Sequence, residues 1–90
     1  MGLSAEQTRE VATHEYNVAR DDVLTVANAP GSVVNPGSFG LAIKALSEGA
    51  ILLGEGDAYY REGQLQRAIA KFSVARDRFE YVDFHLERAT

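Results

Sequence analysis

A run of apolar residues, spaced alternately three and four positions apart, occupies the last third of the chain and constrains its fold most strongly. The alternation continues unbroken over nearly four heptads, through Leu65, Ala68, Phe72, Ala75, Phe79, Val82, Leu86 and Ala89. This spacing places the whole run on one face of an α-helix, because a strand would need alternation at every second residue. The pattern predicts a long helix over residues 64–88 whose apolar seam packs against other helices.

The N-terminal third shows a second helical pattern. Ser4 and Gln7 have the spacing of a capping box, in which each side chain satisfies a free backbone amide at the start of a helix. The apolar residues behind them again recur at spacings of four and three: Ala12, Tyr16, Ala19, Val23 and Val26. Pro30 cannot continue a helix. We therefore predict a first helix over residues 4–28.

Residues 29–38, "APGSVVNPGS", form the only obvious loop. Ser38 follows a Pro-Gly pair and is predicted to cap the middle helix, over residues 39–62. This helix is apolar on two sides, which indicates more than one neighbouring helix. One side carries Phe39, Ala42, Ile43, Leu46, Ala50, Leu53 and Tyr60, and the other carries Ala45, Leu52 and Tyr59.

Three helices of similar length and short connections predict the fold class. The chain has 90 residues, which is enough for one domain and too few for two. No segment shows the pattern of a strand. We expect residues 1–90 to form a single all-α domain, an antiparallel three-helix bundle.

Glycines recur at seven-residue intervals through the middle helix. Gly49, Gly56 and Gly63 are spaced in this way, and Ala42 extends the series. A glycine inside a helix costs about 1 kcal/mol relative to alanine. The series therefore predicts a groove along the middle helix, where the third helix approaches closely. It also predicts a tight turn at Gly63.

The residues around this turn resemble a tetratricopeptide repeat (TPR), a helix–turn–helix unit of 34 residues. Gly56 and Tyr59 lie at the spacing of that family on the first helix, and Ala68, Phe72 and Ala75 match it on the second. The resemblance covers roughly residues 49–82. Three positions depart from the family pattern: Leu52 stands in place of its Trp, Glu55 in place of its Leu and Glu80 in place of its Pro.

The resemblance implies a binding surface for a partner protein on the inner face of the repeat's first helix. Transferred to this chain, that face comprises Ala50, Leu53, Asp57, Tyr60 and Arg61. A single repeat cannot bury its own faces. The alternative interpretation is therefore that the N-terminal helix covers this surface, with Asp57 and Arg61 forming an ion pair one turn apart and Tyr60 at the edge of the core.

A second candidate surface lies near the C-terminus. Several large apolar residues are crowded there on more than one side of the third helix: Phe79, Tyr81, Val82, Phe84 and Leu86. They cannot all point into one three-helix core. Either some of them close the ends and edges of the bundle, or they form an exposed apolar patch that mediates self-association.

The charges of the chain bear on its partners. Nine Lys and Arg stand against thirteen Asp and Glu, so the net charge of −4 disfavours general binding to nucleic acid. Arg67, Lys71 and Arg78 share the outer side of the third helix and predict a mildly basic face. This face is either solvated or faces an acidic partner, with nucleic acid as the less favoured alternative. No aromatic residues alternate with these bases as they do in single-strand binders.

Catalytic and metal-binding patterns are not found in the sequence. There is no cysteine, and His14 and His85 stand in neither of the spacings typical of metal ligands in helices. We therefore expect no enzyme, no metal and no cofactor. The longest apolar run, Ala50 to Leu53, is too short for a membrane span, and the N-terminal residues do not resemble a signal peptide. A cytoplasmic location is expected.

Three functional hypotheses follow. The first is a small helical interaction module or adaptor that binds a partner protein through exposed helical faces. The second is a structural protein that forms its own oligomer, such as a homodimer, through the seam of the third helix. The third is a small regulator that inhibits a larger enzyme by occlusion. None of them needs a cofactor.

Overall fold

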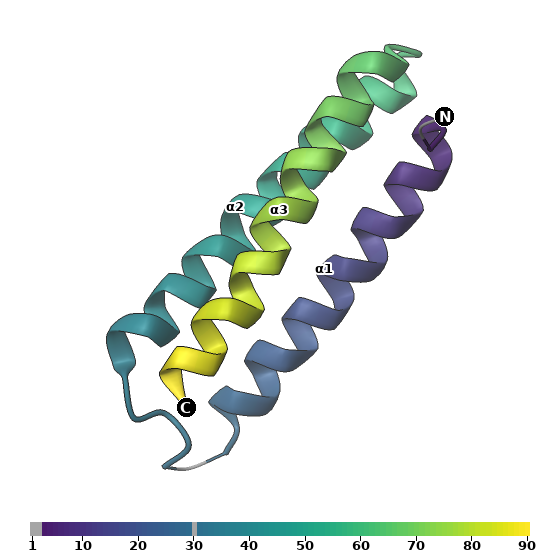
Figure 1. Cartoon of the computed structure of the whole chain (residues 1–90). Coiled ribbons are helices and arrows are strands. Elements are labelled where there is room, and N and C mark those ends of the chain that lie inside the picture. Colours follow the sequence, from purple (N-terminus) through teal and green to yellow (C-terminus); the bar gives the residue numbers. More distant parts are fainter. Residues whose placement is uncertain (1–2, 30) are drawn as a thin grey trace.

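Three antiparallel helices make up the computed structural model, which describes residues 3–29 and 31–90. They are α1 (Ala5–Ala27), α2 (Pro36–Arg61) and α3 (Leu65–Ala89). Within the described residues no strand occurs. α1 and α3 run in the same direction and α2 runs in the opposite one, in an elongated bundle of 46 × 19 × 19 Å (Figure 1). The predicted all-α three-helix bundle is confirmed.

The helix ends follow from local sequence. Ser4 Oγ accepts a hydrogen bond from Gln7 N, and Gln7 Oε1 accepts one from Ser4 N, each at 3.1 Å, which is the predicted capping box. Gly63 has a φ of +77°, a conformation that residues with a side chain rarely adopt. It makes the predicted turn between α2 and α3, closed by a hydrogen bond from Gln64 N to Tyr59 O of 2.9 Å.

The start of the middle helix differs from the prediction. α2 begins at Pro36 rather than at residue 39, and its cap is Asn35 rather than Ser38. Asn35 Oδ1 accepts a hydrogen bond from Ser38 N at 3.2 Å. Proline is favoured in the first turn because its missing N–H has no partner there in any helix. The Pro-Gly pair, expected in the loop, therefore belongs to the helix.

The preceding loop is attached to the far end of α3. The backbone amides of Val34 and Asn35 both donate to the carbonyl oxygen of Ala89, at 2.8 and 3.0 Å. The last carbonyl groups of a helix have no partner within the helix itself. The loop thus supplies hydrogen-bond donors to a carbonyl group at the end of α3, and it positions the start of α2 beside that end.

The closest packing in the bundle joins α2 to α3 through glycine. A Cβ atom added at Gly56 would stand 2.5 Å from Cε1 of Phe72, and one added at Gly49 would stand less than 3.0 Å from the ring of Phe79. Such distances are far shorter than ordinary carbon–carbon contacts, so both rings lie directly on the backbone of α2. The predicted close approach at the seven-residue glycine series is confirmed at these two positions.

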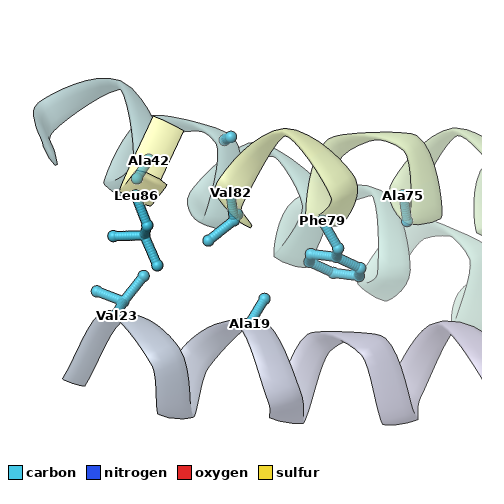
Figure 2. Close-up of a cluster of buried hydrophobic side chains, with 8 residues drawn as sticks. Ala19, Val23, Ala42, Ala75, Phe79, Val82 and Leu86 are labelled. Carbon is cyan, nitrogen blue, oxygen red and sulfur yellow. The ribbon is translucent and has the colours of Figure 1, made fainter. Parts of the chain in front are cut away.

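α1 completes the core with small side chains. Ala12 packs with Phe72, and Ala19 and Val23 pack with Phe79 and its neighbours on α3. In Figure 2 the side chain of Val23 points toward Leu86, while Phe79 lies between the helices. The ring of Tyr16 is tilted at 60° to that of Phe79, with centroids 5.6 Å apart.

This core corrects the predicted self-association surface. Phe79, Val82 and Leu86 are 2%, 0% and 6% exposed, so they belong to the interior of the single chain. The unbroken seam explains this position, because all three lie on the stripe of α3 that faces both other helices. Only Tyr81 and Phe84 remain accessible, at 51% and 49%.

Two glycines of α2 provide a direct test of the close packing. We expect Gly56→Ala to lower the free energy of unfolding by up to about 2 kcal/mol, because overpacking against Phe72 outweighs the gain of about 1 kcal/mol in helix propensity. Gly54→Ala, where nothing lies within 4 Å of the added Cβ, should instead raise it by up to about 1 kcal/mol. Urea unfolding of the two variants measures both effects. Equal stabilisation by both alanines would contradict the packing argument.

Candidate interaction surfaces

The surface predicted from the TPR resemblance is largely covered by α1. Arg9 Nε of α1 donates to Oδ1 of Asp57 at 2.7 Å, and its guanidinium lies 5.2 Å from the centroid of the Tyr60 ring. Leu53 packs against both core clusters, whereas Arg61 is exposed. The alternative interpretation, a face occupied by the first helix, therefore applies to Asp57 and Tyr60. Asp57 pairs with Arg9 and not with Arg61.

The predicted basic side chains of α3 are separated from one another by local contacts. Lys71 Nζ lies 3.5 Å from Oε1 of Glu55 on α2, and the guanidinium of Arg67 lies 5.8 Å from the centroid of the Tyr59 ring. Arg78 is half-buried farther along the helix. These contacts attach the bases to α2 in part, rather than leaving them as one free stripe.

The outer side of α3 carries an exposed aromatic cluster. The ring of His85 stacks with Tyr81, at 6.2 Å between centroids, and meets Phe84 edge-on at 5.3 Å. The guanidinium of Arg88 lies 5.5 Å from the centroid of Phe84. A broad surface depression of about 530 Å³ adjoins the cluster; it is lined by Val74, Asp77, Arg78, Glu80, Tyr81 and Phe84, all of α3.

A further apolar surface on α2 was missed by the sequence interpretation. It faces away from the other two helices, and we call it the outer face of α2. Ile51 and Ile43 are 65% and 43% exposed there. A Cβ atom added at Gly40 or Gly54 would have no neighbouring atom within 4 Å. The available signal was a second seven-residue series of small residues: Gly40, Ser47 and Gly54.

The composition of α2 is unusual for a helix so little buried. Among the described helices, α2 is the only one long and apolar enough to cross a membrane, judged by length and composition alone. Yet only 22% of the residues in its most apolar stretch are buried in the bundle. It also carries Lys44 and Glu48 near its middle. Much of the apolar surface of α2 is therefore exposed in the isolated chain.

A groove runs between α1 and α3 and was also missed. It consists of two cavities of about 300 and 290 Å³ that share Asp83, and we call it the α1–α3 groove. The first cavity is lined by His14, Glu15, Val18, Phe79, Glu80 and Asp83. The second is lined by Asp22, Thr25, Val26, Asp83, Leu86, Glu87 and Thr90. No Lys or Arg is among these lining residues.

Carboxyl groups crowd together in this groove. Partial burial raises the pKa of Asp83 from 3.8 to about 6, and the neighbouring Asp22 and Glu87 add to the effect. When protonated, Asp83 can donate a hydrogen bond to Asp22, which the ionised pair cannot form. Farther along, Arg76 Nε pairs with Oε1 of Glu15 at 3.3 Å, and Glu15 Oε2 is inaccessible and has no hydrogen-bond partner among the described residues.

The raised pKa of Asp83 predicts how stability depends on pH. The folded state binds this proton more tightly than the unfolded chain does, so the contribution of Asp83 to stability falls as pH rises from about 4 through about 6. We expect Asp83→Asn to raise the melting temperature at pH 7.5 and to change it little at pH 4. Thermal unfolding followed by circular dichroism at both pH values measures this difference. An equal shift of the melting temperature at both pH values would contradict the repulsion between Asp83 and its acidic neighbours.

No protein-family model, curated protein or solved structure matches this chain. The TPR resemblance of residues 49–82 therefore remains a prediction from the sequence.

Proposed function

We propose that this chain is a small helical interaction module that binds a partner protein through the outer face of α2. One observation carries the proposal: Ile51 and Ile43 are 65% and 43% exposed on an uncovered helical face that also contains Gly40 and Gly54. Large apolar side chains exposed together on one face are typical of binding sites. The partner is expected to be another protein, in the cytoplasm.

The opposite side of α2 illustrates how such a surface binds. There Gly49 and Gly56 allow the rings of Phe79 and Phe72 to rest on the helix backbone. Gly40 and Gly54 offer the same bare backbone on the outer face, flanked by isoleucine side chains. A partner helix that presents large apolar residues would pack there in the same way. This use of a TPR-like hairpin differs from the inner-face binding that the resemblance implies.

Self-association is the second candidate function. The exposed pair Tyr81 and Phe84 favours it, because two large aromatic side chains lie beside a depression on the outer side of α3. Aromatic residues are enriched at protein interfaces. A homodimer through this cluster would use only the accessible part of the predicted self-association surface.

Substitution of Ile51 tests the first proposal. We expect Ile51→Lys to leave the melting temperature nearly unchanged, since surface substitutions usually change stability by less than about 0.5 kcal/mol. Partner capture from cell extract, quantified by mass spectrometry, should fall about tenfold or more, because a central apolar contact dominates binding energy. Leu24→Lys on α1 is the matched control, since Leu24 is 49% exposed and lies outside this face. Equal capture by both variants would refute the outer face as the binding site.

Light scattering over a concentration series separates the two candidates. A dimer that Tyr81→Ser dissociates and Ile51→Lys does not would support self-association through α3. A dimer that Ile51→Lys dissociates and Tyr81→Ser does not would identify the partner of α2 as a second copy of the chain. A monomer at all concentrations favours a different protein as the partner.

A further inference from the structure

The α1–α3 groove has the dimensions of a helix-docking site. Its lining extends from His14 to Val26 on α1 and from Phe79 to Thr90 at the end of α3. The two segments span twelve and eleven residue steps, which at 1.5 Å per residue is about 16 to 18 Å, or three helical turns. α1 and α3 lie side by side along this length (Figure 1). A groove between two aligned helices is where a further helix packs in a four-helix bundle.

The residues of the groove suit one face of an amphipathic helix. Val18 and Val26 of α1 supply the accessible apolar side chains of the groove, beside the buried core residues Phe79 and Leu86. Val18 is 42% exposed, although it is large and apolar. The groove therefore presents apolar surface that the three helices of the chain leave uncovered.

The charge of the groove specifies its occupant. Five carboxyl groups line the two cavities, with His14 as the only basic side chain among the lining residues. The repulsion among Asp22, Asp83 and Glu87 is unrelieved in the isolated chain. A cationic partner placed along this line would relieve it, whereas nucleic acid, or a second copy of a chain with a net charge of −4, adds negative charge.

We propose that the α1–α3 groove binds a basic amphipathic helix of a partner protein. Apolar residues of that helix lie over Val18 and Val26, and its Lys or Arg side chains pair with Asp22, Asp83 and Glu87. The site shares no residue with the outer face of α2 and goes beyond the function proposed for that face.

Binding of this helix is coupled to pH. A cation beside Asp83 favours its ionised form, so binding near pH 6 releases a proton and the affinity rises between pH 5 and pH 7.5. The groups facing Asp83 are Asp22 of α1 and Glu80 and Glu87 of α3, all acidic, with His14 in the same cavity. Histidine side chains also titrate in this range. His14→Gln therefore separates the contribution of the histidine.

A synthetic 14-residue amphipathic helix of leucine and lysine, carrying a fluorescent label, is the probe. Fluorescence anisotropy against the full chain at pH 7.5 should show saturable binding, about fivefold to tenfold weaker for the Asp22→Asn/Asp83→Asn double variant. The control double variant, Glu48→Gln/Asp77→Asn, carries the same change in charge outside the groove and should bind as the wild type does. Val18→Ser should also weaken binding, because it removes apolar surface.

The outcomes divide clearly. Loss of affinity in the groove variants but not in the control variant supports the site. A rise in affinity from pH 5 to pH 7.5 also supports it, provided that the rise is smaller in Asp83→Asn and unchanged in His14→Gln. Equal weakening by both double variants would show attraction to net charge alone and would overturn the proposal. Absence of binding, or equal binding of a matching peptide of leucine and glutamate, would overturn it as well. Circular dichroism of each variant confirms that the bundle remains folded.

Discussion

Two phenylalanine rings packed on two glycines hold the α2–α3 hairpin together, and much of the molecule depends on this contact. Phe79 rests on Gly49 and Phe72 rests on Gly56, two turns apart along both helices. Because no side chain separates the ring from the backbone, the two helices approach closely. Small residues therefore occupy much of the side of α2 that faces α3, and large residues such as Ile43 and Ile51 are left toward solvent.

α1 joins the hairpin in a different way. The side chains that it buries are small, chiefly alanines, and ion pairs supplement them: Arg9 with Asp57 and Arg76 with Glu15. These pairs are partly exposed, and such pairs typically contribute less than about 1 kcal/mol each. Beyond both pairs, nearer the end of α1, Asp22 and Asp83 repel each other across the interface. The two ion pairs thus hold the start and the middle of α1, its second half is held by Ala19 and Val23 in the core, and the α1–α3 groove opens beside that half.

Much of the fold was predictable from local patterns, and the errors have physical causes. The capping box at Ser4 and the turn at Gly63 depend only on nearby residues, and both are confirmed. The start of α2 was misplaced because Pro36 reads as a helix breaker, although proline is favoured in the first turn. The candidate surfaces were predicted less well. The three-four spacing separates buried Val82 from exposed Tyr81, yet the crowding of large residues near the C-terminus led the prediction to group both in one self-association surface.

The sequence by itself determined three helices, the stripe of α3 that is buried and the glycines at which α2 and α3 meet. These features follow from the 3.6-residue period of the helix and from steric limits that act over a few residues. The tertiary structure decided which surfaces stay open. Arg9 meets Asp57 across 48 positions of the chain, and Arg76 meets Glu15 across 61. Contacts at such separation depend on how whole helices pack, so the covered inner face, the outer face of α2 and the α1–α3 groove appear only once all three helices are in place.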